Sequence, residues 1–245
     1  MEIRFGLIRR IAFPDFFYMK DMINKTTPTQ SDPHKDEKVL ERGAPASRAK
    51  AAMIILHGRG ATAAGIAGLS DEFAQPDVRY LIPQAAGQTW YPYPFTVPVD
   101  HNQPHLDSAL AKVNRLIDQL VDEGISRDRI VLLGFSQGAC LALLYAALHP
   151  AKYGGIVSLS GALIGDDLSK DAYSGDLDQT PVFLGVGENE TYFSPDRFHQ
   201  SADIMQQLNG NVTRRIYPAA EHQITEDEVS FVRGLLSSMV LEHRN

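Results

Sequence analysis

Apolar runs of strand length recur along the chain from about residue 50 onwards. Most of these runs are nearly continuous rather than alternating, a pattern typical of parallel strands that are covered on both faces. The pattern predicts strands at residues 51–56, 78–82, 129–133, 156–159, 181–186 and 212–217.

Helical patterns lie between these runs. Apolar residues recur with a helical period over 106–121, and the stretch 139–148 is apolar all round, which predicts a buried helix. Ser194 is placed to cap a further helix, and Thr225 with Glu228 three residues later predicts a capping box for the last one. Strands that alternate with helices indicate an α/β fold with a parallel sheet, in which chemistry collects at the carboxyl ends of the strands.

The first 35 residues follow a different pattern. Basic residues alternate there with aromatic and aliphatic ones, and Arg9-Arg10, Pro14-Asp15 and Lys20-Asp21 interrupt any apolar region that could serve as a secretory signal. We therefore expect a flexible extension over 1–35 and one catalytic domain over 36–245. The alternative is an arm that touches a membrane surface.

Composition limits the class of protein and its partners. With 44% hydrophobic residues, the 245-residue chain can bury one substantial core, and its single cysteine suits a reducing, cytoplasmic compartment. The formal net charge of −7 is concentrated after residue 50, which argues against a nucleic-acid partner. No apolar stretch is long enough for stable membrane insertion.

The sequence Gly134-Phe135-Ser136-Gln137-Gly138 directly follows a predicted strand and precedes the predicted buried helix. This is the strand–turn–helix context in which G-x-S-x-G forms a nucleophile elbow. The glycines allow a tight turn, and the turn lifts the serine hydroxyl out of the sheet. Ser136 is the predicted nucleophile.

A serine hydroxyl needs a neighbouring base to remove its proton. In this arrangement the base follows the last strand, and His222 lies there, in the loop before the capped final helix. The other histidines fit less well, and Pro104 separates His101 from His105, so these two cannot form a helical zinc pair. We predict that His222 is the general base and that the site needs no metal.

The acid that orients the imidazole should follow the preceding strand. The loop after 181–186 contains Glu188 and Glu190 but no aspartate before the next helix. We favour Glu190 as the acid, with Glu188 and the pair Asp166/Asp167 as alternatives.

Two backbone N–H groups should stabilise the tetrahedral oxyanion. One is predicted at Gln137, at the start of the helix after the nucleophile. The other is predicted at Arg59, in the glycine-rich loop after the first predicted strand. Trp90 and Tyr91 lie in an aromatic, proline-rich loop on the same side, and we predict that they form a substrate pocket wall rather than cover the edge of the core.

These segments carry a family resemblance. From about Lys38 onwards the chain resembles the phospholipase/carboxylesterase family, relatives of the acyl-protein thioesterases and dienelactone hydrolases. The matching segments are His57-Gly58-Arg59-Gly60, Pro83-Gln84-Ala85, Thr89-Trp90-Tyr91, Gly134-Phe135-Ser136-Gln137-Gly138, Leu159-Ser160-Gly161 and Tyr217-Pro218 followed by His222. The chain departs from the family at Glu190, where the family usually has Gly-x-x-Asp, and over residues 1–35.

The resemblance implies a compact α/β-hydrolase fold without a large lid, often dimeric, that acts on carboxylic esters or thioesters without a cofactor. We therefore expect a serine carboxylesterase acting on small to medium acyl or aromatic esters. The alternatives are a lysophospholipase or acyl-protein thioesterase, and a catalytically silent binding protein on the same fold.

Overall fold

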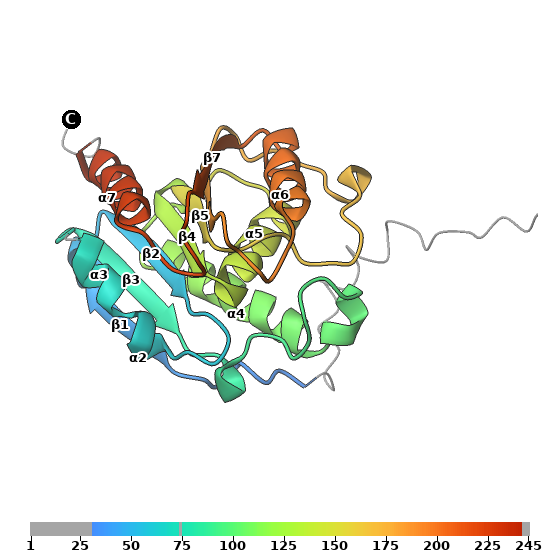
Figure 1. Ribbon diagram of the computed structural model, residues 1–245. Helices are drawn as coiled ribbons and strands as arrows, with labels where there is room; N and C mark the ends of the chain where they lie inside the picture. The colour runs from blue at the N-terminus through green and yellow to red at the C-terminus, as the bar shows by residue number, and fades with distance from the viewer. Residues whose placement is uncertain (1–30, 74, 242–245) are drawn as a thin grey trace, which may run out of the picture. The chain divides into compact units, whose positions relative to one another are not determined.

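The structure is a computed structural model that describes residues 31–73 and 75–241, and within them seven strands form one sheet in the order β1-β3-β2-β4-β5-β6-β7 (Figure 1). Neighbouring strands run parallel except at the first edge, where β1 pairs antiparallel with β3. The strands are β1 (Val39–Gly43), β2 (Ala51–Leu56), β3 (Val78–Pro83), β4 (Ile130–Phe135), β5 (Gly155–Leu159), β6 (Pro181–Gly187) and β7 (Asn211–Tyr217).

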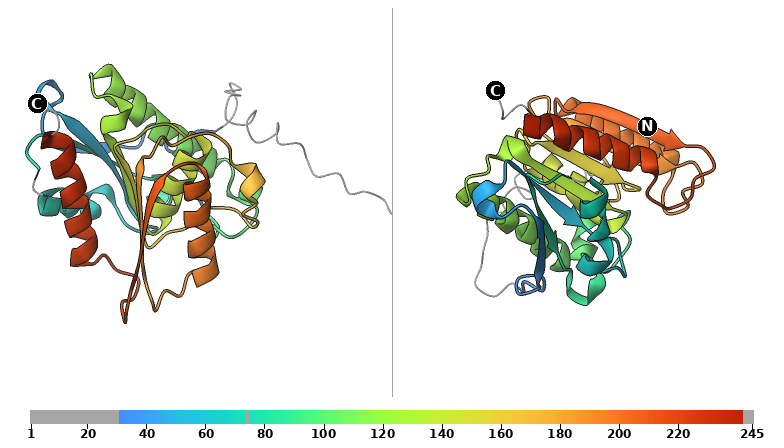
Figure 2. Two further views of the ribbon diagram at one scale, coloured as in Figure 1. Left: turned by 90° about the horizontal axis from the view of Figure 1, so that it is seen from above. Right: turned by 90° about the vertical axis from the view of Figure 1, so that its left-hand side faces the viewer.

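Helices cover both faces of this sheet. The helices are α2 (Ala63–Ile66), α3 (Gly68–Phe73), α4 (His105–Asp122), α5 (Gln137–Leu148), α6 (Pro195–Gln207) and α7 (Glu226–Leu241). One hydrophobic cluster joins the sheet to α4, α5 and α6, and a second joins the opposite face to α2, α3 and α7. Figure 2 shows α6 and α7 on opposite sides of the strands. Within the described residues, no helix is both long and apolar enough to cross a membrane.

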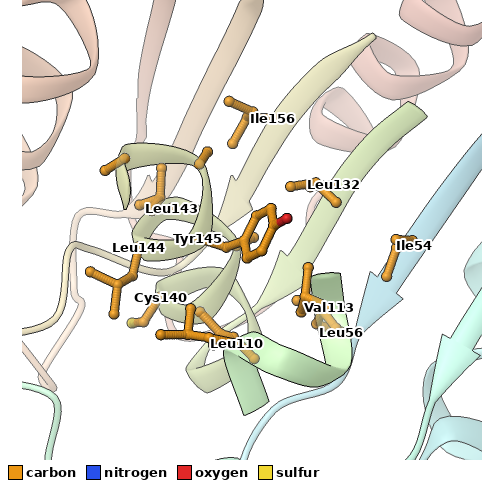
Figure 3. Packing of buried hydrophobic residues seen from close by; sticks show 14 of the residues in the cluster. Ile54, Leu56, Leu110, Val113, Leu132, Cys140, Leu143, Leu144, Tyr145 and Ile156 are labelled. Atoms are coloured by element: carbon orange, nitrogen blue, oxygen red, sulfur yellow. The ribbon is translucent and has the colours of Figure 1, made fainter. Parts of the chain in front are cut away.

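Helix α5 lies at the centre of the first cluster. The Tyr145 ring of this helix packs near Leu132 of β4, as Figure 3 shows, and Leu143, Leu144 and Ile156 of β5 belong to the same cluster. Every residue from 137 to 147 is buried, which confirms the prediction of a helix that is apolar all round. Ser136, which directly precedes this helix, is therefore anchored to an almost fully buried element.

All six predicted strands are present, with ends within one or two residues of those expected. The sequence did not reveal β1, because its pattern Val-Leu-Glu-Arg-Gly is half polar and its last three residues are exposed at the sheet edge. The short helices α2 and α3 were also missed. Neither is long enough to show a clear apolar period.

Both predicted helix caps are formed. The Ser194 hydroxyl accepts a hydrogen bond from the Arg197 N–H at 3.3 Å. At the start of α7, the Thr225 N–H donates to Glu228 Oε2 at 2.7 Å, and the Glu228 N–H donates back to Thr225 Oγ1 at 3.3 Å. This reciprocal pair is a capping box, and it fixes where the loop that carries His222 ends.

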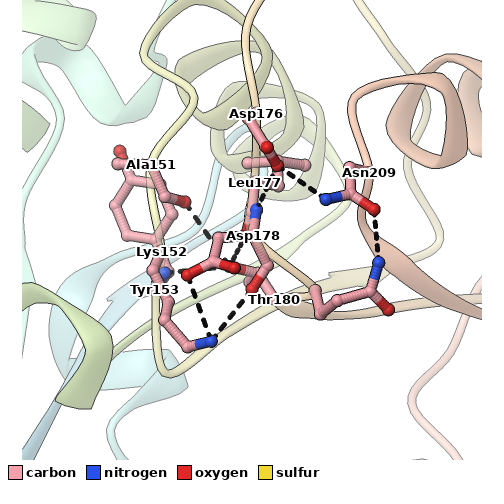
Figure 4. Close-up of polar contacts among 9 residues, drawn as sticks. Ala151, Lys152, Tyr153, Asp176, Leu177, Asp178, Thr180 and Asn209 are labelled. Atoms are coloured by element: carbon pink, nitrogen blue, oxygen red, sulfur yellow. Dashed lines mark hydrogen bonds and ion pairs between the residues drawn. The ribbon is translucent and has the colours of Figure 1, made fainter.

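Polar contacts fix the entry to β6 at the edge opposite the predicted site (Figure 4). Asn209 Nδ2 donates to Asp176 Oδ1 at 2.8 Å, and Asn209 Oδ1 accepts from the Gln179 side chain. Lys152 forms an ion pair with Asp178 at 3.3 Å. These contacts join the segments before β5, before β6 and after α6. They therefore stabilise the sheet at the amino ends of its strands, away from the predicted site.

The segment 31–38 packs on the domain, which corrects the boundary predicted at residue 35. His34 is fully buried: its Nε2 lies 2.9 Å from the Trp90 carbonyl oxygen, and its Nδ1 accepts the Ala86 N–H at 3.0 Å. Asp32 forms an ion pair with Arg115 of α4 at 2.9 Å. The compact unit therefore begins at Ser31, while residues 1–30 of the predicted extension lie outside the described residues.

The buried histidines make stability depend on pH. Burial lowers the pKa of His34, and also that of His57 and of His149, below the value of about 6.5 for free imidazole. The unfolded chain then binds protons that the folded chain does not, so stability is lost as the pH falls below about 6.5.

We expect the melting temperature to fall on acidification from pH 7 to 5, and His34→Gln to make that fall shallower while lowering stability at pH 7 by about 1–2 kcal/mol. Thermal unfolding of the full chain across this pH range measures both effects. If the melting temperature of His34→Gln depended on pH as that of the unsubstituted chain does, protonation of His34 would not contribute to the loss of stability.

Candidate active site

Ser136 lies in the tight turn between β4 and α5, with φ 55° and ψ −117°. Residues other than glycine rarely adopt a positive φ, and strain of this kind clusters at functional sites. Neither flanking glycine has room for a side chain, because a Cβ on Gly134 would collide with Gly138 and one on Gly138 would collide with the Leu56 carbonyl. The turn holds Ser136 half-exposed at the carboxyl edge of the sheet.

His222 lies beside Glu190. Its Nδ1 is 2.7 Å from Glu190 Oε2, and the side chains are 24% and 4% exposed respectively. The other three acidic residues that the sequence left open make different contacts. Glu188 Oε2 accepts the Ala219 N–H at 3.2 Å, and Asp166 and Asp167 interact electrostatically with Arg197. Of the three predicted sources, the structure brings Glu190 to the imidazole.

The Glu190 side chain folds back over its own loop. Its Oε1 accepts hydrogen bonds from the N–H groups of Thr191 and Tyr192, each at 2.9 Å. These two contacts take up the additional methylene of glutamate and aim Oε2 at His222. This is how the chain accommodates glutamate where the resemblance leads one to expect aspartate.

The loops after β6 and β7 lie against each other. The Glu188 N–H donates to the Tyr217 carbonyl at 2.9 Å, and the Asn189 N–H donates to the Ala220 carbonyl at 3.1 Å. A Cβ on Gly187 would collide with the Ala220 carbonyl. Backbone contacts therefore set the distance between the two loops, independently of the acid–histidine pair.

An aromatic contact brings the residue before Ser136 next to His222. The Phe135 ring, which directly precedes Ser136, lies 5.0 Å from the His222 ring between centroids. Within residues 31–73 and 75–241, the Ser136 hydroxyl itself makes no hydrogen bond. Catalytic hydrogen bonds are often long in unliganded enzymes and tighten when substrate binds.

The glycine-rich loop after β2 lies directly beside Ser136. A Cβ on Gly58 would touch the Ser136 Cβ at 3.4 Å. Fully buried His57 organises this loop: its Nδ1 lies 2.8 Å from the Gly58 carbonyl oxygen, and its Nε2 accepts the Ala85 N–H at 3.1 Å. These contacts require a neutral imidazole, and burial favours it because it lowers the pKa of His57.

The two predicted oxyanion donors are both available. Among the described residues, neither the Arg59 N–H nor the Gln137 N–H is paired with an acceptor. The Arg59 guanidinium is turned away, and donates to the carbonyls of Pro92 and Tyr93 at 2.8 and 2.9 Å. Unpaired N–H groups beside a serine are what a developing oxyanion requires.

The structure differs from the prediction that Trp90 and Tyr91 form a pocket wall. Their side chains are 0% and 1% exposed and belong to the core. Their backbone instead holds Gln137, whose Oε1 accepts the Trp90 N–H at 2.9 Å and whose Nε2 donates to the Tyr91 carbonyl at 2.8 Å. The bulk of the two rings favours burial, and the sequence alone did not show which side of the loop they occupy.

An apolar hollow of about 310 Å³, which the sequence did not predict, opens beside the turn at Ser136. It lies between the loop after β2, the helices α2 and α3, the turn at Ser136 and the segment after His222. Its lining residues are Gly58, Ala61, Gly65, Ile66, Leu69, Phe135 and Ile224. The residues that could have indicated the hollow are Ile66 and Leu69. These two apolar side chains lie on α2 and α3 and remain only partly buried.

Other reactive groups lie away from this site or are chemically quiet. The described residues contain no group of three or more His, Cys, Asp or Glu side chains that could hold a metal ion. Burial raises the pKa of Cys140 to about 11, so its thiol stays protonated and packs in the core.

Comparison with known proteins places these features in a family. A model of the phospholipase/carboxylesterase family matches residues 38–240. The acyl-protein thioesterase 1 of Saccharomyces cerevisiae is 29% identical over 219 residues, which cover 78% of this chain and 95% of that protein. A probable carboxylesterase of Oryza sativa subsp. japonica is 26% identical over 198 residues, which cover 73% of this chain and 83% of that protein.

The fold has a near match among solved structures. A phospholipase/carboxylesterase from Dyadobacter fermentans superposes with a TM-score of 0.79 at 38% sequence identity, covering 87% of this chain and 100% of that one. This match confirms the predicted α/β-hydrolase fold.

Proposed function

Because the chain belongs to the phospholipase/carboxylesterase family, we propose that it is a serine carboxylesterase that hydrolyses esters of small to medium acyl groups through an acyl-enzyme intermediate. Membership of this family supports hydrolysis of esters or thioesters. The observation that carries the finer proposal is the 2.7 Å contact between His222 Nδ1 and Glu190 Oε2, beside a strained serine elbow.

In the acylation step, Ser136 Oγ attacks the carbonyl carbon of the ester while His222 Nε2 removes the hydroxyl proton. Glu190 accepts the Nδ1–H and thereby leaves Nε2 free to act as the base. The carbonyl oxygen becomes an oxyanion that the Arg59 and Gln137 N–H groups stabilise. The intermediate collapses when the carbon–alkoxide bond breaks and His222 gives its proton to the departing alcohol.

In the deacylation step, a water molecule takes the place of the alcohol. His222 removes one of its protons, the hydroxide attacks the acyl-serine carbonyl, and the Ser136–acyl bond breaks. The carboxylic acid leaves and Ser136 recovers its proton from the imidazole. Over the two steps, one ester and one water molecule give one alcohol and one carboxylic acid, with no change of oxidation state.

We propose that the apolar hollow beside the elbow holds the acyl group. Its volume of about 310 Å³ lies at the small end of ligand pockets, which supports short to medium acyl chains. Leu69→Trp should fill part of it and lower kcat/KM for p-nitrophenyl octanoate at least 10-fold relative to p-nitrophenyl acetate. Val121→Trp places the same ring at an exposed position of α4 and is the matched control. An equal loss of kcat/KM on both esters would show that the acyl group does not bind in this hollow.

A thioesterase is the second candidate, favoured by relatives named acyl-protein thioesterase 1. Oxygen and sulfur esters of one acyl group, compared over increasing chain length, separate the candidates. Carboxylesterase function predicts higher kcat/KM on the short oxygen esters. A preference for long-chain thioesters, including acylated peptides, would contradict the carboxylesterase proposal and support the thioesterase.

A further inference from the structure

Tyr192 combines high exposure with a contact in the proposed triad. Among the described residues, it is the most exposed large hydrophobic side chain, at 68%. Its ring nevertheless lies 4.7 Å from the His222 ring between centroids, tilted by 59°. An aromatic side chain that stays open to solvent while it covers the general base is not explained by core packing.

The chain on both sides of Tyr192 holds this ring in place. Its own N–H donates to Glu190 Oε1 at 2.9 Å, so the backbone is tied to the acid. The next residue, Phe193, packs edge-on against Phe95 with ring centroids 5.7 Å apart, which links this loop to the loop after β3. Tyr192 is thus tethered at its backbone and at its neighbour, while its side chain remains available.

The chemistry of the triad decides which part of a substrate meets this ring. His222 gives its proton to the departing alcohol, so the oxygen of the leaving group must come within hydrogen-bond reach of the imidazole. The acyl group lies on the other side of the scissile bond, where the apolar hollow lies beside the oxyanion loop. The side chain that covers the imidazole and is open to solvent therefore faces the leaving group.

We propose that Tyr192 forms the leaving-group subsite and that the enzyme favours esters whose alcohol part is aromatic. This proposal rests on the proposed roles of Ser136 and His222. A planar ring in the leaving group can pack against the Tyr192 ring, offset-stacked or edge-to-face, whereas a small alkyl group offers little area to it. The phenolic hydroxyl is not needed for this contact.

The test compares two esters that share one acyl group, 2-naphthyl acetate and ethyl acetate, on the full chain. Both form the same acetyl-enzyme, so a leaving-group residue affects acylation and leaves deacylation unchanged. Tyr192→Leu should lower kcat/KM for 2-naphthyl acetate about 3- to 10-fold, the range of one aromatic pair contact. It should change ethyl acetate less than 2-fold and leave the deacylation rate unchanged. Tyr192→Phe is the matched control and should behave like the unsubstituted chain.

Other outcomes would overturn the proposal. Equal losses on both esters, or slower deacylation, would mean that the ring acts only by holding His222 in place. Unchanged kinetics on both esters would mean that the leaving group does not meet Tyr192. Failure of the underlying mechanism has a different signature, because Ser136→Ala would then hydrolyse both esters at the original rate.

Discussion

Ser136→Ala is expected to lower kcat for ester hydrolysis by about 10⁴- to 10⁶-fold, the loss typical when the nucleophile of a triad is removed. The change deletes one oxygen from a half-exposed side chain and leaves the elbow glycines in place. The fold and the melting temperature should therefore stay close to those of the unsubstituted chain. Steady-state hydrolysis of p-nitrophenyl acetate, together with thermal unfolding, measures both.

Ser160→Ala is a closely matched control. Ser160, like Ser136, directly follows a parallel strand, and its φ is 54°, against 55° at Ser136. Its hydroxyl is buried and has no hydrogen-bond partner among the described residues. We expect it to retain nearly full activity. If Ser136→Ala kept more than a tenth of the original rate, the nucleophile would have to lie elsewhere.

Glu190→Gln is expected to lower kcat by about 10²- to 10⁴-fold with little change in KM. The substitution keeps the shape of the side chain but removes the charge that stabilises the imidazolium formed during acylation. The amide can also present its NH₂ group to Nδ1, which favours the unproductive tautomer. Glu190→Asp should lower kcat less than Glu190→Gln does, because the negative charge remains. Some loss of kcat is still expected, because the shorter side chain cannot make all three contacts seen for Glu190.

Glu188→Gln is the matched control for this prediction. Glu188 is two residues away and accepts the Ala219 N–H through Oε2, a contact that an amide oxygen can also make. We expect less than a 3-fold change in kcat. Full activity in Glu190→Gln with a large loss in Glu188→Gln would transfer the role of the acid to Glu188, and full activity in both would mean that His222 works without a carboxylate.

The sequence predicted the parts of the site that depend on strand order and tight turns. The position of Ser136 follows from two glycines between a strand and a buried helix, and that of His222 follows from the capping box after the last strand. Residues close together in the sequence determine the glycine turn and the capping box, and the structure contains both. The α/β fold was predictable for the same reason, because continuous apolar runs alternate with helical patterns.

The sequence did not predict features that depend on tertiary contacts. His34 gave no local signal, yet it fits a buried space between the Trp90 carbonyl and the Ala86 N–H. The rings of Trp90 and Tyr91 are bulky enough for either a pocket or a core, and packing placed them in the core. The contact between Tyr192 and His222 arises only because the loops after β6 and β7 lie together.

Covalent labelling of the full chain with a fluorophosphonate, followed by peptide mapping, tests the central claim most directly. The reagent reacts with a serine that a neighbouring base activates and remains attached as a phosphonyl ester. We expect one adduct, on the peptide that contains Ser136, formed with parallel loss of esterase activity. We also expect no adduct in Ser136→Ala and slower labelling in Glu190→Gln. An adduct on another residue, or ester hydrolysis that continues after Ser136 is fully labelled, would contradict that claim.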